Sequence, residues 1–341
     1  MREPSPIPVE TLRAAALEGW GVRLEWLEFL PLGADPASWV YRGETADGPL
    51  LVKLRGGQPN EAGLALPRAL RDAGLEQIVA PLAGVGGRLW VPVADARLML
   101  YPFIAGRPGA EGGQTTAQWR EFGALVRRLH DAALPPAVAA LLAEERLEPA
   151  WEPALAGIAA AIEHAPANDE IGGEFRAIWR ERQPLIDQLR RQAAELADEL
   201  RRRPAPLAVC HADLHTWNTL IDDAGRLWLI DWDTAVLARR ERDLMFVVGG
   251  IAKGLVSPAD TEAFFAGYGP AELDPAALAY YRHAWALQDI AGFSEELAAP
   301  ASPDGAGENR RAAFRWLKGL FEPGEIVSIA LGSERAPRRF G

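Results

Sequence analysis

The segment from His211 to Asp233 constrains the fold of this chain more than any other, because its polar residues interrupt apolar stretches at fixed spacings. Asn218 lies five residues after Asp213, and Asp231 lies thirteen residues after Asn218. Turn-forming Asp and Gly residues fill positions 222–225. The flanking apolar stretches are predicted as short strands: residues 207–210, 218–221 and 226–230. A hairpin therefore returns Asn218 and Asp231 to the same end, beside the loop that carries Asp213.

The residue types in this hairpin indicate phosphoryl transfer. The spacing His-x-Asp-x-x-x-x-Asn is that of a kinase catalytic loop. Asp213 is the predicted catalytic acceptor or orienter of a substrate hydroxyl proton. Asn218 and Asp231 are the predicted metal ligands, because Mg²⁺ takes amide and carboxylate oxygens when it is shared with phosphates. The alternative, in which acidic residues only make turns and caps, suits Asp222 and Asp223.

The same residues resemble a known family. His211-x-Asp213-x-His215-x-x-Asn218, together with Ile230-Asp231-Trp232-Asp233, looks like the aminoglycoside phosphotransferase and choline kinase-like family. The continuation to Ala235 and the stretch 241–246 are most similar to its spectinomycin-phosphotransferase branch, and the likeness extends more weakly over most of the chain. The resemblance implies a bilobal, protein-kinase-like α+β fold. It also implies transfer of the γ-phosphoryl group of ATP or GTP, with Mg²⁺, to a hydroxyl of a small molecule.

Apolar periodicity predicts two lobes: an N-terminal nucleotide-binding lobe over residues 1–104 and a helical C-terminal lobe over 105–341 that contains the catalytic hairpin. The Pro- and Gly-rich residues 102–113 are the predicted hinge. Pro184 is expected to kink or divide its helix. A five-stranded antiparallel sheet is predicted from residues 24–30, 39–43, 49–54, 89–93 and 97–101. Helices are predicted over residues 8–20, 60–73, 116–129, 136–147, 170–202, 241–254, 258–267, 275–299 and 306–321.

Lys53 is the predicted phosphate-binding residue of the nucleotide site. It is one of only three Lys, and it interrupts an apolar strand. A strand lysine reaches the phosphates in kinases, although a lysine at a strand edge can also point to solvent. Glu61 is the candidate for the helix carboxylate that orients this lysine. The alternative for Glu61 is a first-turn residue favoured by the helix dipole, and Pro67 weakens the predicted helix.

Two further stretches are candidates for nucleotide contact. The loop 31–38 occupies the position of a phosphate-covering loop, but Gly33 is its only glycine, so phosphate contact is expected from backbone amides and the Ser38 hydroxyl. By resemblance, backbone groups near the hinge would bind the nucleotide base, and the corresponding residues are Leu100, Tyr101, Phe103 and Ile104.

On the acceptor side, the predicted substrate residues are Asp233, Trp217, Tyr281, Trp285 and Asp289, and for Asp233 the alternative is support of the metal site. The last three share a late helix with Tyr280 and Glu295, where acids could pair with ammonium groups and rings could stack on a sugar. An amphipathic helix with a solvated acidic face explains that pattern equally well. His211 and His215 are expected to be structural, with His211 as a loop anchor, and Asp243 is expected to cap a helix or brace the loop.

Composition narrows the class of partner. With 341 residues and 49% hydrophobic residues, the chain can bury a large core. Its net charge of −11 argues against nucleic acid and anionic membranes as partners and is compatible with a cationic small molecule. The single cysteine, Cys210, is expected to be a buried strand residue. No apolar leader or membrane span is found, so a cytoplasmic protein of undetermined oligomeric state is expected.

The acceptor is predicted as an aminoglycoside or aminocyclitol antibiotic, possibly spectinomycin-like, which would make the biological role antibiotic resistance. One alternative keeps the chemistry and changes the acceptor to choline, homoserine, a methylthio-sugar or a macrolide. Another is a nucleotide-binding regulator without turnover. The intact set of Lys53, Asp213, Asn218 and Asp231 argues against the regulator.

Overall fold

The computed structural model describes residues 3–32, 37–57, 60–164, 170–298, 306–333 and 338–340. The chain forms two compact units, each discontinuous in sequence. The first unit contains residues 1–143 and 211–237, and the second contains residues 144–210 and 238–341. The chain therefore passes between the units three times, whereas the sequence predicted a single boundary near residue 104.

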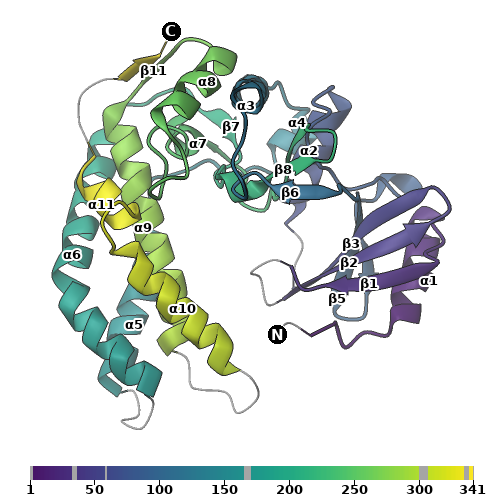
Figure 1. Cartoon of the computed structure of the whole chain (residues 1–341), viewed down its shortest axis with the longest axis horizontal. Coiled ribbons are helices and arrows are strands. Elements are labelled where there is room, and N and C mark those ends of the chain that lie inside the picture. Colours follow the sequence, from purple (N-terminus) through teal and green to yellow (C-terminus); the bar gives the residue numbers. More distant parts are fainter. Residues whose placement is uncertain are drawn as a thin grey trace. The chain divides into compact units, whose positions relative to one another are not determined.

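The first unit contains the predicted five-stranded antiparallel sheet, in the order β1-β2-β3-β5-β4. Its strands are β1 (Trp26–Leu30), β2 (Ser38–Thr45), β3 (Gly48–Gly56), β4 (Val91–Val93) and β5 (Ala96–Pro102). Helix α1 (Val9–Trp20) covers one face of this sheet (Figure 1). Leu12 of α1 is buried in one core cluster with Leu54 of β3 and Leu100 of β5. Because side chains alternate along a strand, Lys53 lies on the other face.

Three helices complete the first unit: α2 (Glu61–Asp72), α3 (Thr116–His130) and α4 (Pro136–Ala139). Helix α2 continues through Pro67, and its buried Leu66 and Leu70 hold it in place although Pro67 lacks an N–H. Thr115 and Gln118 form a reciprocal capping box at the start of α3. The predicted helix over residues 136–147 is wrong beyond residue 139, since Leu147 has a left-handed φ of 56°.

The predicted hairpin is present, but it belongs to the first unit and not to the helical one. Strands β8 (Thr219–Asp222) and β9 (Leu227–Leu229) form the hairpin, and β6 (Gly106–Pro108), inside the predicted hinge, pairs with β8. The Leu229 N–H donates to the Gln77 carbonyl at 2.8 Å, and the Val79 N–H donates to the Leu229 carbonyl at 3.0 Å. These long-range backbone bonds attach the hairpin to the unit that contains the sheet.

The second unit is mainly helical and confirms the α+β class. Its helices are α5 (Glu152–His164), α6 (Glu170–Arg201), α7 (Glu241–Leu244), α8 (Pro258–Tyr268), α9 (Pro275–Ala298), α10 (Ala306–Leu320) and α11 (Ile326–Leu331). Its short strands are β7 (Ala208–Cys210), β11 (Ala271–Leu273) and β12 (Arg338–Phe340), and β10 (Val236–Ala238) spans a boundary between the units. Helix α9 contacts α5, α6, α10 and α11 (Figure 1).

Helices of this unit differ from the sequence-based expectation at three places. Helix α6 is one continuous helix that includes Pro184, so this proline does not divide it. Helix α5 was not predicted. The helix predicted over residues 241–254 ends at Leu244, because Gly249, Gly250 and Gly254 adopt positive φ angles of 83°, 69° and 81°.

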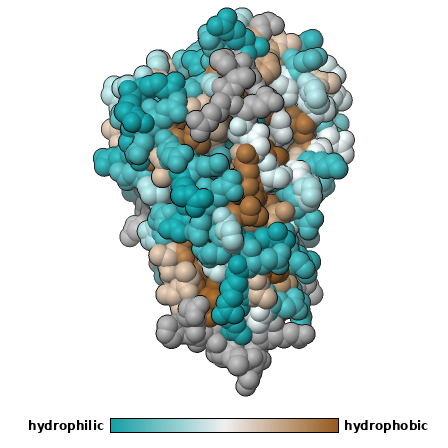
Figure 2. Space-filling view, turned by 90° about the vertical axis from the view of Figure 1, so that its left-hand side faces the viewer, coloured by the Kyte–Doolittle hydropathy of each residue, from teal (hydrophilic) through white to brown (hydrophobic). Residues whose placement is uncertain are grey.

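The face drawn in Figure 2 is mainly hydrophilic, and its hydrophobic residues are scattered in small groups, one of them near the centre. Among the helices of the described residues, none has both the length and the apolar character needed to span a membrane. The predicted buried state of Cys210 is confirmed, and burial raises the pKa of its thiol.

Candidate functional site

The loop that carries Asp213 is fixed by contacts from both of its flanks. His211 Nε2 lies 2.8 Å from the Ile230 carbonyl oxygen, in agreement with its predicted role as an anchor. The Thr234 hydroxyl donates to the His211 carbonyl at 2.9 Å. Ala212 and Asp231 are both in the left-handed region, with φ angles of 66° and 62°. Non-glycine residues in this region cost on the order of 1–3 kcal/mol and concentrate at functional sites.

Asp213 lies among hydrogen-bond donors. Asn218 Nδ2 donates both to Asp213 Oδ2 and to its backbone oxygen, each at 2.8 Å. His215 Nε2 lies 3.0 Å from Asp213 Oδ1, a contact that we did not predict. Burial raises the pKa of Asp213, but the hydrogen bond and charge of His215, the charge of His211 and the Asn218 amide together lower it below its usual value. The Asp213 carboxylate is therefore negatively charged at neutral pH.

Asn218 and Asp231 offer the oxygens expected of Mg²⁺ ligands. The contacts recorded for the Asn218 side chain in the described residues use Nδ2, so its Oδ1 is the atom that suits a cation. The Ile230 N–H donates to the Asn218 backbone oxygen at 3.0 Å, which holds the two ends of the hairpin together. Asp231 follows directly and is exposed. One amide and one carboxylate oxygen fit a hard divalent cation that also binds phosphates.

Lys53 belongs to the same unit and lines a hollow over the sheet face opposite α1. Its Nζ lies 3.4 Å from Asp233 Oδ2, and Arg55 NH1 lies 2.8 Å from the same oxygen. The residues that line the hollow are Lys53, Arg55, Gly56, Gly57, Asn60, Leu64, Arg97, Met99, Tyr101 and Asp233. Three cations and one carboxylate give this lining a formal charge of 3 − 1 = +2, which suits an anionic ligand.

The structure does not pair Lys53 with Glu61, the carboxylate predicted for that role. Glu61 is exposed in the first turn of α2, and its Oε1 accepts a hydrogen bond from Trp90 Nε1 at 3.1 Å. The carboxylate beside Lys53 comes instead from Asp233, 180 residues further along the chain. Asp233, predicted as a substrate residue, is therefore engaged by cations of the nucleotide side.

Two of the predicted base-binding residues, Leu100 and Tyr101, have side chains on opposite faces of the sheet, because side chains alternate along a strand. The Leu100 side chain is buried in the core beneath α1, and its carbonyl already accepts the Leu82 N–H at 2.7 Å, so this carbonyl is not offered to a nucleotide base. Tyr101 lines the hollow, where burial and the charges of Asp233 and Asp231 raise its pKa. The Arg42 guanidinium lies 5.1 Å from the centre of the Phe103 ring. Ile104 is partly buried.

Ser38 begins β2 and is buried opposite Arg55 in the strand register. It therefore lies across the strand pair from a residue of the hollow. Gly33 belongs to residues 33–36 of the predicted phosphate-covering loop, which lie outside the described residues.

The predicted acceptor residues have different environments. Trp217 is 50% exposed beside Asn218, as a ligand-contacting ring must be. Tyr281 is fully buried, and its hydroxyl donates to Glu145, so the structure does not support its assignment as a substrate residue. Trp285 packs edge to face with Phe246, with ring centres 4.9 Å apart. Asp289 is partly buried.

A second hollow, which the sequence analysis missed, lies in the helical unit. Its charged lining consists of three acids, Glu144, Glu145 and Glu148, and two arginines, Arg146 and Arg242, so it is acidic by one formal charge. Tyr280, Ala284 and Gln288 of α9 complete one side of it. The signal was present in the run Glu144-Glu145-Arg146-Leu147-Glu148. The sequence predicts a helix over this run, whereas the structure has no helix there.

Comparison with known proteins agrees with this geometry. The signature of the phosphotransferase enzyme family matches residues 26–295. Protein StrN of Streptomyces griseus is 28% identical over 304 residues, which are 82% of this chain and 82% of that protein.

Solved structures show the same protein-kinase-like fold. The complex of spectinomycin phosphotransferase APH(9)-Ia with ADP and spectinomycin has a TM-score of 0.87 and 26% identity. The match covers 97% of this chain and 100% of that one. Choline kinase LicA from Streptococcus pneumoniae has a TM-score of 0.52 and 16% identity, with 91% and 98% covered, and shares the fold alone. By the family match and by this fold, the chain belongs to the phosphotransferase enzyme family.

Proposed function

We propose that the protein transfers the γ-phosphoryl group of ATP to a hydroxyl of an aminocyclitol or aminoglycoside, with a spectinomycin-like compound as the first candidate. The observation that carries the proposal is the charged Asp213, held by Asn218 and His215 in the unit that also contains Lys53. The likeness over the full length of a spectinomycin phosphotransferase bound to ADP supports both the donor and the acceptor class. Phosphorylation would inactivate such an antibiotic, which makes resistance the proposed biological role.

Each residue has one task in this reaction. Asp213 orients the acceptor hydroxyl and takes its proton, and its lowered pKa keeps it in the charged form that this task needs. Lys53 holds phosphate oxygens of the donor. Asn218 and Asp231 would hold Mg²⁺, which neutralises charge on the phosphates as the transferred group moves. A loose transition state needs little more from the protein than this positioning and electrostatic stabilisation.

The acidic hollow of the helical unit supports a cationic acceptor. Glu144 and Glu148 are exposed at its rim and Glu145 is partly buried, so ammonium groups of an aminocyclitol would find carboxylate partners there. Arg146 and Arg242 in the same lining weaken this attraction. A neutral acceptor would gain little from such a lining.

A choline-type acceptor is the second candidate, because a quaternary ammonium group is also cationic and the choline kinase fold is shared. A macrolide is the third, by the same fold. Three alternatives stay predictions from the sequence alone: homoserine or methylthio-sugar as the acceptor, GTP as the donor, and a nucleotide-binding regulator without turnover.

The test is a coupled assay of ADP release from Mg²⁺-ATP. It compares spectinomycin, an aminoglycoside, choline and a macrolide, with mass spectrometry of the product. Phosphorylated spectinomycin or aminoglycoside is the expected result. Turnover only with choline or a macrolide would transfer the proposal to that acceptor, and nucleotide binding without any acceptor-dependent product would contradict it.

A further inference from the structure

We infer that Asp233 is the positioning residue that holds Lys53 for the donor phosphates, in place of the helix glutamate that has this role in the kinase template. The inference rests on the proposed function, because it concerns the nucleotide side of that site. It also predicts that Arg55 and Asn60 influence the position of Lys53 indirectly, because both contact Asp233.

The first argument is the convergence of two cations on one carboxylate oxygen. Asp233 Oδ2 lies 2.8 Å from Arg55 NH1 and 3.4 Å from Lys53 Nζ. The side chains of Lys53, Arg55 and Asp233 are 23%, 30% and 31% exposed, so the group is partly desolvated but still open to a ligand. An ammonium has three hydrogens to donate, and the contact with Asp233 uses one of them. Two remain for phosphate oxygens.

The second argument is that helix α2 holds Asp233 from the other side. Asn60, which caps α2, donates from Nδ2 to the Asp233 backbone oxygen at 2.5 Å and accepts the Gly63 N–H on Oδ1 at 3.2 Å. A Cβ on Gly63 would lie 3.0 Å from Asp233 Oδ1 and 3.1 Å from the Trp232 carbonyl oxygen. Glycine at this position therefore permits the close approach. The positive end of the α2 dipole then lies beside the carboxylate.

The third argument is electrostatic. Arg55 shares the carboxylate oxygen with Lys53, so it offsets the negative charge of Asp233 that would otherwise repel phosphates. The hollow keeps its formal charge of +2 although it contains an acid. Asp233 thus fixes the position of the lysine without cancelling the attraction for an anion.

Glu61 is the competing candidate, and its geometry does not favour it. Its carboxylate is exposed and accepts a hydrogen bond from Trp90, whereas Asp233 is in contact with both Lys53 and Arg55. The two assignments make opposite predictions for two variants that remove one carboxylate charge each.

The experiment is a double-mutant cycle on the full chain with Lys53→Met, Asp233→Asn and the combination, and with Glu61→Gln as the matched charge-removal control. Steady-state kinetics with ATP and the preferred acceptor give kcat and KM, and calorimetry gives the affinity for Mg²⁺-ATP. We expect Asp233→Asn to lower kcat/KM for ATP by roughly 10- to 100-fold, as expected for a hydrogen bond to a charged group. When Lys53 is already replaced by Met, Asp233→Asn should change kcat/KM for ATP by less than about twofold, since the effects of coupled residues are not additive.

Additive losses would overturn the inference, because Asp233 would then act independently of Lys53. So would a loss in Glu61→Gln that matches the loss expected for Asp233→Asn. If Asp233→Asn does not fold, Arg55→Met replaces it in the same cycle, with the same non-additivity expected and the same additive outcome overturning the inference. Calorimetric binding of nucleotide tests the inference even if no acceptor is phosphorylated, so its failure can be told from failure of the proposed function.

Discussion

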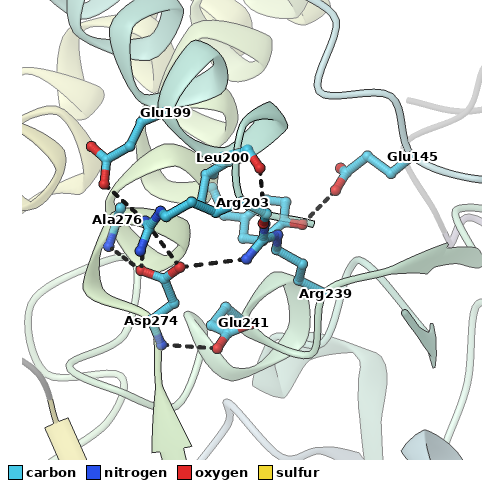
Figure 3. Close-up of polar contacts among 9 residues, drawn as sticks. Glu145, Glu199, Leu200, Arg203, Arg239, Glu241, Asp274 and Ala276 are labelled. Atoms are coloured by element: carbon cyan, nitrogen blue, oxygen red, sulfur yellow. Dashed lines mark hydrogen bonds and ion pairs between the residues drawn. The ribbon is translucent and has the colours of Figure 1, made fainter. Parts of the chain in front are cut away.

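The hairpin of the first unit and the polar cluster of the second unit use similar residues in opposite ways. In the hairpin, Asp231 is exposed and Asp213 is partly buried. In the second unit, Arg239 is buried and donates to the Leu200 and Arg203 carbonyls (Figure 3). It also pairs with Asp274 at 3.4 Å. The two regions differ in exposure: the Asp213 side chain is 21% exposed although its oxygens have protein partners, whereas the Arg239 side chain is only 8% exposed.

The largest effect is expected in the hairpin. Asp213→Asn keeps the shape of the side chain but removes the acceptor of the hydroxyl proton, so kcat should fall by about 10²- to 10⁴-fold, the usual contribution of a general base. Asp223→Asn makes the same chemical change at an exposed turn residue of the same hairpin and should leave kcat unaltered. Steady-state ADP release measures both. Equal activity of the two variants would show that Asp213 has no special role.

The second largest effect concerns the buried cluster. Asp274 connects its elements: it accepts from the Ala276 N–H at 3.0 Å, pairs with Arg203 at 3.2 Å, and its N–H donates to Glu241 at 3.0 Å (Figure 3). Arg239→Met leaves Asp274 and two carbonyls without a buried cation. We expect a loss of about 3–5 kcal/mol in the free energy of unfolding, as for other broken buried pairs.

The matched control for Arg239→Met is Arg339→Met, whose pair with Glu272 is 77% and 64% exposed. An exposed pair contributes roughly 0–1 kcal/mol, so this variant should unfold near the wild-type urea concentration. Similar losses in both variants would remove the contrast between a buried structural network and an exposed ion pair.

Separation along the chain decides how much of the site the sequence could predict. Asp213 and Asn218 are five residues apart and His211 and Ile230 are nineteen apart, so their contacts follow from one hairpin. Lys53 and Asp233 are 180 residues apart. No local pattern contains that contact, and the nearby Glu61 was predicted instead.

Alternation along strands predicts which side chains of β5 line the hollow. Met99 lies opposite Lys53 in the strand register, so the next residue, Leu100, must point to the opposite, core face. The β2–β3 and β4–β5 hairpins of the sheet were predictable, because short turns connect their strands, whereas helix α2 lies between β3 and β4 in the chain. Tyr281 could not be excluded from the acceptor residues, since its partner Glu145 is 136 residues away.

A smaller effect is expected from Tyr281→Phe. The change removes the hydroxyl that donates to Glu145 and leaves a partly buried carboxylate with one donor fewer. We expect a loss of about 1–3 kcal/mol in stability, the usual penalty for such a group. Tyr280→Phe removes the same atom from the neighbouring residue, which lines the acidic hollow, and should cost less. Thermal unfolding of both variants measures the difference, and a reversed order would refute the structural role of the Tyr281 hydroxyl.

The smallest expected effect is a difference between Glu145 and Asp213, two partly buried carboxylates, in how their removal changes stability with pH. Burial raises the pKa of Glu145, and the charges of Arg242 and Arg239 and the Tyr281 hydrogen bond only partly oppose it. A raised folded-state pKa favours folding below the unfolded pKa, and this contribution is lost as pH rises through the folded value. Glu145→Gln should therefore gain stability relative to wild type, by less than about 1 kcal/mol, at pH 8, and the gain should disappear near pH 4.

Asp213→Asn should have the opposite pH trend, because the lowered pKa of Asp213 contributes stability above its unfolded pKa and loses it in acid. Urea unfolding at the two pH values measures both trends. If the stability of both variants changed with pH in the same direction relative to wild type, the two regions would not differ in the direction in which they shift the pKa of a carboxylate.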